Sequence, residues 1–202
     1  YLNEINERYG AKEFLVLTYS PKDKMVSEES IKNLFELKND LQNLNWVHNV
    51  ITLLDIPLLD ATDDSLVDRI QNFKTLKSEN IDKDRGFNEI LNSPVFRNFV
   101  ISEDGRTSGI IVYIKPNNEE IKNKSKKDLE IIKDKLKKER HKNILEIREV
   151  IKKYNQNTEI YLGGIPMIAD DMMTFIKNDI ITFGLGVFIF IILTLWYVFR
   201  KI

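Results

Sequence analysis

The sequence contains no cysteine and only two histidines among its 202 residues. Without cysteine it can have neither a disulfide framework nor a thiolate metal site. The histidines, His48 and His141, lie far apart, and no set of histidines and carboxylates has the spacing of metal ligands. We therefore expect no metal and no other cofactor.

An excess of one charge is also lacking, because 30 Lys and Arg residues face 31 Asp and Glu residues, for a net charge of -1. A balanced chain without a nucleic-acid-binding motif gives no reason to expect nucleic acid as a partner. The sequence also lacks a phosphate-binding loop, a nucleophile elbow and the residue order of a serine-histidine-aspartate triad. We therefore expect that the chain is not an enzyme.

No secretion signal opens the sequence. The residues from Tyr1 onward do not combine a basic region, an apolar core and a small-residue cleavage site. If the domain lies outside the cytoplasm, an upstream segment must carry it there, and an earlier transmembrane helix is the simplest carrier. We expect the sequence to be an excerpt of a longer protein.

One long hydrophobic run is present, from Ile180 to Phe199. A helix of roughly 20 apolar residues spans the hydrocarbon core of a bilayer. The alternative is a buried core helix, which the absence of a polar stripe argues against. Trp196 and Tyr197 near one end of the run, and Arg200 and Lys201 after it, are the expected anchors at the membrane boundary.

The basic residues at the end of the run also predict its orientation. Cytoplasmic flanks of membrane helices carry an excess of lysine and arginine. We therefore expect Arg200 and Lys201 in the cytoplasm and residues 1 to about 178 outside it. A bacterial inner (plasma) membrane fits this arrangement.

The residues before the run have the apolar patterns of a mixed α+β domain over residues 1–166. The Asp104-Gly105 pair predicts a tight hairpin turn between two strands. Expected strands cover residues 14–19, 46–54, 99–102, 107–114 and 158–162. Expected helices cover residues 27–44 and 118–154, with a short one near 86–91 inside an irregular insertion at 55–92.

The order of these elements resembles a ferredoxin-like α+β sandwich, in which two helices cover one face of a mostly antiparallel sheet. A further helix from about Met167 to residue 202 is expected to lead into and span the membrane. Between the last strand and this helix stands Gly163-Gly164-Ile165-Pro166. Glycine permits a sharp turn and proline restricts the backbone, so Gly163, Gly164 and Pro166 form either a hinge or an ordinary rigid turn.

Two charged stretches allow alternative interpretations. Asp170-Asp171 is either an ion or proton site or, as we favour, an acidic first helical turn in water. Residues 122–142 are rich in lysine, which suits either the capture of anionic headgroups or acidic ligands or, more commonly, the solvated face of a long helix.

Several short segments of the sequence, taken together, resemble those of a known family. They are Tyr1-Leu-Asn-Glu-Ile with Tyr9-Gly and Glu13-Phe-Leu-Val-Leu-Thr-Tyr, then Leu44-Asn-Trp-Val-His-Asn-Val-Ile-Thr-Leu, Ile56-Pro-Leu-Leu, Ser93-Pro-Val-Phe-Arg-Asn-Phe-Val-Ile-Ser and Tyr161-Leu-Gly-Gly-Ile-Pro. In this order and spacing they resemble the first extracytoplasmic loop and second transmembrane helix of an RND-superfamily transporter. The similar branch is the MMPL type, which is related to Patched. Residues 59–85 fit the resemblance least.

The resemblance implies a porter lobe of a proton-driven exporter of lipids or other hydrophobic molecules. Its implied partners are membrane lipids, the remaining helices and second porter lobe of the same transporter, and the hydrophobic substrate; its oligomeric state stays open. The proton-relay carboxylates of such transporters lie in later helices, so the resemblance assigns that role to no residue of this sequence. The residues alone also allow a sensor domain of a signalling receptor or a tail-anchored protein.

Overall fold

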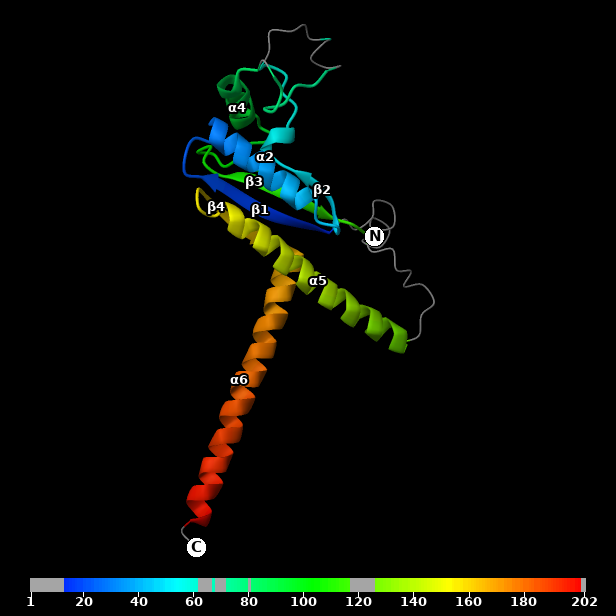
Figure 1. Ribbon diagram of the computed structural model, residues 1–202, viewed down its shortest axis with the longest axis vertical. Coiled ribbons are helices and arrows are strands. Elements are labelled where there is room, and N and C mark those ends of the chain that lie inside the picture. The colour runs from blue at the N-terminus through cyan, green and yellow to red at the C-terminus, as the bar shows by residue number, and fades with distance from the viewer. Residues whose placement is uncertain (1–12, 62–66, 68–71, 80, 117–125, 201–202) are drawn as a thin grey trace.

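The computed structural model describes residues 13–61, 67, 72–79, 81–116 and 126–200. Within these residues the chain forms an α+β lobe and one long helix that leaves it (Figure 1). The elements in chain order are β1 (Phe14–Pro21), α2 (Glu28–Gln42), β2 (Val47–Ile51), the 3-10 helix η1 (Leu53–Asp55), α4 (Lys83–Asn92), β3 (Ser108–Ile114), α5 (Lys126–Tyr154), β4 (Thr158–Gly163) and α6 (Ile165–Phe199).

The four strands form one antiparallel sheet in the order β2-β3-β1-β4. Side chains alternate along each strand, so that Leu15, Leu17 and Tyr19 of β1 point to one face and are fully buried. On β3 the residues that alternate in the same way, Ile110 and Val112, are also fully buried. One face of the sheet therefore carries the core.

Helices α2 and α5 pack side by side on this buried face. The buried residues of α2 recur at three- and four-residue spacing (Leu34, Leu37 and Leu41), as do those of α5 (Ile144, Ile147 and Ile151). Strand order, antiparallel pairing and the two helices on one face confirm the predicted ferredoxin-like α+β lobe.

Ser27 caps the start of α2. Ser27 lies directly before the helix, and its hydroxyl oxygen accepts a hydrogen bond from the Ser30 backbone N–H at 3.2 Å. The buried Tyr19 hydroxyl donates to the Ser30 carbonyl oxygen at 2.8 Å, which ties β1 to the first turn of α2. Burial, and then the nearby charge of Glu29, raise the pKa of Tyr19 above its ordinary value.

The predicted hairpin is only partly correct. Gly105 adopts a φ of 69°, as the turn requires, and the Ser102 N–H donates to the Thr107 carbonyl oxygen at 2.8 Å. Residues 99–102, however, form no strand, and Ile101 makes only isolated bridges, with Arg97 and with Ser108. One reason is that β2 pairs with Ile111–Ile114 of β3, which leaves only the first residues of that edge for the arm. The other is that the chain turns before Ile101, where the Val100 N–H donates to the Phe96 carbonyl oxygen at 2.8 Å.

Other boundaries differ more modestly from the prediction. The second strand ends at Ile51 rather than Leu54, because Thr52 starts the turn of η1. The short helix of the insertion, α4, covers residues 83–92 and is longer than expected. For the long helix predicted at 118–154, residues 118–125 lie outside the described residues, and α5 is described from Lys126.

Candidate functional site

The lobe connects to α6 through a turn at Gly164, between the end of β4 and the first residue of α6. Gly164 has φ 117° and ψ 155°, in a region of backbone conformation that is essentially reserved for glycine. A Cβ atom added there would lie 3.2 Å from the Phe14 backbone oxygen. At Gly163 the nearest atom, the Val16 backbone oxygen, would be at an ordinary 3.7 Å. Of the two glycines in the predicted hinge, only Gly164 is thus required by its geometry.

Helix α6 begins at Ile165, two residues earlier than expected, so Pro166 lies within its first turn. Proline suits this position because the first N–H groups of a helix have no partner within the helix. Pro166 is also buried, although the helix is otherwise largely exposed. The proline therefore anchors the start of α6 in the lobe.

A histidine–carboxylate contact and an ion pair join α5 to α6 below this turn. Nδ1 of His141 lies 2.9 Å from a carboxylate oxygen of Asp170. One guanidinium nitrogen of Arg148 donates to both carboxylate oxygens of Asp171, each at 2.8 Å. We call the turn at residues 163–166 together with these two pairs the lobe–helix junction.

The sequence did not reveal these two pairs. We favoured an acidic first helical turn for Asp170 and Asp171, but they lie five and six residues into α6 and bind side chains of α5. The available signal was weak: His141 and Arg148 are seven residues apart, which places both on one face of a helix. Which helix that face would meet depends on the crossing of α5 and α6, which no pattern in the sequence specifies.

An ion pair between Arg140 and Glu13, and a recess beside it, adjoin the junction. Arg140 of α5 donates to both carboxylate oxygens of Glu13, at 3.1 and 3.3 Å, directly before β1. Beside this pair lies a recess of about 330 Å³. Its lining comprises the Glu13–Arg140 pair and the mostly apolar residues Phe14, Gly164, Ile165, Pro166 and Ala169.

Beyond the junction α6 runs freely away from the lobe (Figure 1). All its residues from Phe175 to Phe199 are exposed, although most are large and apolar. A core helix of a soluble protein would bury such residues, so the core-helix alternative is wrong. By length and composition α6 is the one helix among the described residues that can cross a membrane.

The predicted boundary residues lie at the far end of α6. The Arg200 guanidinium carbon lies 5.0 Å from the centre of the Trp196 ring, within the range of a cation–π contact. The Tyr197 side chain is exposed on the same stretch of helix. Lys201 lies outside the described residues.

The insertion is fastened to the lobe by Asp55. Its carboxylate accepts hydrogen bonds from the ammonium groups of Lys38 at 2.5 Å and Lys77 at 2.9 Å, and from the Thr52 backbone N–H at 2.9 Å. Burial by itself would raise the pKa of Asp55. The hydrogen bonds from Lys38, Lys77 and Thr52 outweigh burial and lower this pKa below its ordinary value.

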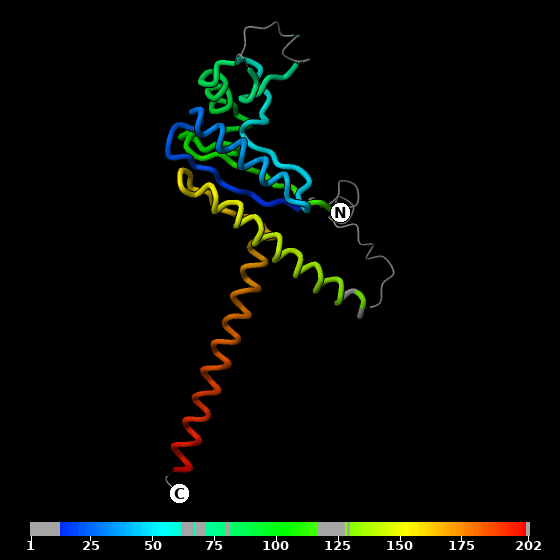
Figure 2. Tube along the Cα trace, in the orientation of Figure 1, coloured from blue at the N-terminus to red at the C-terminus, as the bar shows by residue number. Residues whose placement is uncertain are grey.

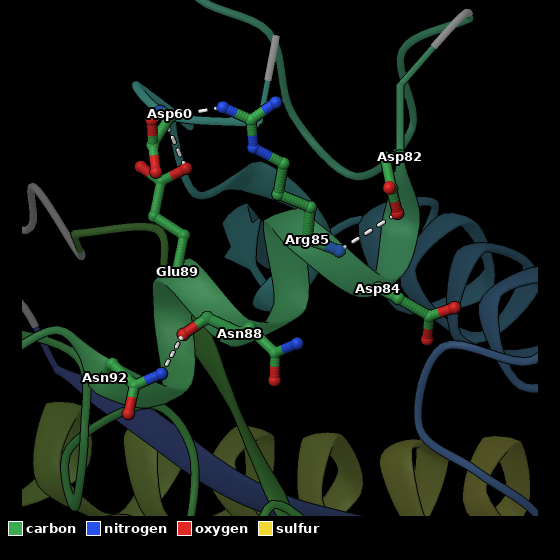
Figure 3. A pocket seen from close by; sticks show the side chains of 7 residues that line it. All are labelled: Asp60, Asp82, Asp84, Arg85, Asn88, Glu89 and Asn92. Carbon is green, nitrogen blue, oxygen red and sulfur yellow. Dashed lines mark hydrogen bonds and ion pairs between the residues drawn. The ribbon is translucent and has the colours of Figure 1, made fainter.

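The carboxylates of Asp60, Asp82, Asp84 and Glu89 line an open pocket of about 530 Å³ beside α4 (Figure 3). Glu89 accepts the backbone N–H groups of Leu59 and Asp60, at 2.6 and 2.8 Å, and Arg85 lies 3.3 Å from the Asp60 carboxylate. These groups hold the start of the insertion, at Leu59 and Asp60, against its own helix α4. In the part of the chain that the structure describes, no group of three His, Asp or Glu residues could hold a metal ion.

Taken together, the fold and the junction define a class: a water-facing α+β lobe joined without a linker to a helix that can span a membrane. The MMPL family matches residues 55–202, which include α4, β3, α5, β4 and α6. The chain belongs to the MMPL family and is a domain of an RND-type membrane transporter. Among curated proteins, none matches the chain.

The residues alone left three functions open: a transporter domain, a receptor sensor and a tail-anchored protein. The family match bears on the choice between them. A transporter domain agrees with the match over residues 55–202, whereas a receptor sensor and a tail-anchored protein have no support from it. The family also agrees with the resemblance, although residues 1–54 lie outside the matched range.

Proposed function

We propose that this chain is the porter lobe of a proton-driven exporter of lipids or other hydrophobic molecules, and that it has no enzymatic activity of its own. In this proposal the lobe lies outside the cytoplasm of a bacterial inner membrane, and Arg200 and Lys201 lie inside. The lobe works with the remaining helices and a second porter lobe of the same transporter.

The observation that carries this proposal is the lobe–helix junction. A lobe that only decorated a membrane anchor would need no more than a linker, but here β4 passes into α6 within one turn. The pairs His141–Asp170 and Arg148–Asp171 additionally fix α6 to a core helix of the lobe. A movement of α6 in the membrane would therefore be transmitted through α5 to the lobe.

In this mechanism Gly163, Gly164 and Pro166 are the hinge. The turn would absorb the change in backbone angles while the ion pairs keep α5 and α6 in contact. The recess beside Gly164 would provide space for a small rotation of Ile165 and Ala169 against Phe14. Substrate would pass as the lobe rocks against its partner lobe.

Transport by the complete protein in proteoliposomes tests the proposed function. An imposed pH gradient should drive the movement of a fluorescently labelled phosphatidylethanolamine between leaflets, and an internal pH dye should report accompanying proton flux. A protonophore should abolish both signals. Lipid movement that is absent, or equal with and without the gradient, would contradict a proton-driven lipid exporter.

The hinge has its own test in the same assay. Gly163 and Gly164 are replaced together by valine, and expression is checked before transport is measured. We expect transport to fall at least tenfold, because valine cannot adopt the backbone angles of Gly164 without strain. Unchanged transport at normal expression would show that the turn is not a hinge.

A further inference from the structure

The amino-terminal part of α5, residues 126–138, projects beyond the sheet; we call it the free half of α5. Among the residues whose side chains are described, from Asp128 to Lys138, none is buried. The buried residues of this helix begin only at Ile144. Figure 2 shows the helix extending past the edge of the sheet. A helical segment of this length measures about 19 Å.

The free half of α5 is strongly basic for a chain with a net charge of -1. Its sequence contains six lysines and only three carboxylates, Asp128, Glu130 and Asp134. Lys137 lies 3.7 Å from Asp134, and Lys135 lies 4.0 Å from Glu139, just beyond the segment. The structure shows no carboxylate partner for Lys133 and Lys138 among the described residues. The exposed Ile131, at 60% of its full accessible surface, adds an apolar side chain to the same segment.

The position of the free half brings this charge toward the membrane. Helix α5 contacts α6 at Asp170 and Asp171, and the apolar run begins at Ile180. Nine residues of helix correspond to a rise of about 14 Å. Figure 1 shows that α5 is inclined, so that its first turns lie on the side toward which α6 runs. The headgroup layer adds about 6 Å to each side of the hydrocarbon core.

We propose that the free half of α5 docks on anionic lipid headgroups, in the leaflet on the lobe's side of the membrane that α6 crosses. Lysine ammonium groups bind the phosphates and Ile131 enters the interface. The proposal depends on α6 spanning the membrane and is independent of what the transporter exports. It assigns the lysines a role that a merely solvated helix face does not have.

Lipid is the occupant that the geometry favours over an acidic protein. The spanning helix α6 keeps a bilayer next to the free half at all times, so docking requires no separate encounter. Surface potentials of anionic membranes extend over a Debye length, about 8 Å at physiological salt. Each lysine at such a surface contributes about fivefold to the docking equilibrium, and lysines near one another contribute together.

The test places a fluorescent reporter on the free half of the complete protein. Residues 1–202 contain no cysteine, so Ile131→Cys carries a single label once any cysteine elsewhere in the complete protein is replaced by serine. The labelled protein is reconstituted in nanodiscs of phosphatidylcholine, with or without about one third phosphatidylglycerol. Trace amounts of a lipid with a headgroup-attached quencher report contact with the interface, and aqueous iodide reports exposure to water. An unchanged pattern of limited proteolysis shows that the lobe is folded in every variant.

Contact should appear only with phosphatidylglycerol and should disappear at about 1 M salt, where the Debye length is about 3 Å. Replacing Lys133, Lys135 and Lys138 together with glutamine should lower the docking equilibrium about a hundredfold. The matched control replaces Lys24, Lys32 and Lys83, which lie on other elements of the lobe, and should leave contact unchanged.

Three results would overturn the proposal. The first is equal quenching in both lipid compositions, which would mean that headgroup charge is irrelevant. The second is an equal loss of contact in the control variant. The third is protection of the label from iodide without quenching from the headgroups, which would show that protein rather than lipid covers the free half of α5.

Discussion

Gly164 has a backbone conformation that residues with a Cβ atom rarely adopt, and it lies against the backbone of β1. Its neighbour Gly163 has no such restriction. The sequence alone does not distinguish the two adjacent glycines, and the predicted hinge contains both. Only the backbone angles and the closeness of Phe14 distinguish them.

A substitution at each glycine should show this difference. Gly164→Ala should destabilise the lobe by about 1–3 kcal/mol, the usual cost of a residue forced into such a backbone conformation. Gly163→Ala should change stability by less than about 0.5 kcal/mol. Thermal unfolding of both variants, followed through Trp46 fluorescence in a Trp196→Phe background, measures the difference. Equal effects would mean that the turn at Gly164 is not the constrained position.

Asp55 is the residue whose ionisation should affect stability most clearly. Its pKa is lowered in the folded lobe by Lys38, Lys77 and Thr52, in spite of burial. A carboxyl group with a lowered folded pKa stabilises the protein above its unfolded pKa, about 3.9. This contribution is lost as the pH falls from there through the lower folded value.

The corresponding prediction concerns the variant Asp55→Asn. At neutral pH it should destabilise the lobe by roughly 1.5–3 kcal/mol, because two lysines lose a charged hydrogen-bond acceptor. Below about pH 4 the difference from the wild type should shrink. Urea unfolding at several pH values measures it, with the exposed Asp23→Asn as the control for loss of one negative charge. A difference that stays constant down to pH 2 would contradict the role of Asp55.

At the scale of secondary-structure elements, the contact between α5 and α6 includes two side-chain pairs, His141–Asp170 and Arg148–Asp171. Asp171 and Arg148 are both partly exposed, with 29% and 40% of their side-chain surface accessible. Exposed ion pairs contribute only about 0–1 kcal/mol each. Their main effect should therefore be on the angle between the helices rather than on global stability.

This effect can be measured with spin labels on the two helices. Cysteines at Lys138 and Lys177 accept the labels in a protein whose cysteines outside residues 1–202 have been replaced by serine, since residues 1–202 contain none. In the double variant Asp170→Asn, Asp171→Asn the distance distribution between the labels should broaden, while the unfolding temperature should fall by only a few degrees. Asp179→Asn, on the same helix, is the control. An unchanged distribution would show that the turn alone sets the angle.

The elements themselves were predictable where local signals and burial agree. Ser27 and the spacing of Leu34, Leu37 and Leu41 specify α2, and the apolar run specifies α6. The arm at 99–102 has residues that favour a strand, but β2 already pairs with Ile111–Ile114 of β3, so the arm reaches only the first residues of that edge. Pairing of that kind depends on the whole sheet, and a local pattern does not contain it.

At the scale of the whole molecule, the sequence predicted the topology of the lobe better than its contacts. The order of strands and helices was sufficient for the ferredoxin-like arrangement, because few topologies place these four strands in one sheet with both helices on one face, even with an insertion between β2 and β3. The ion pairs across α5 and α6, and the attachment of the insertion through Asp55, involve residues far apart in the sequence. Their pairing follows from the assembled lobe and not from any motif.

The central claim is that α6 spans the membrane and holds the lobe outside the cytoplasm. Single cysteines at Lys32 in the lobe and at Ile202 after α6 test it with a membrane-impermeant maleimide on intact cells. The account predicts that the cysteine at position 32 is labelled in intact cells and the one at position 202 only after permeabilisation. Labelling of position 202 in intact cells, or of position 32 only after permeabilisation, would contradict it.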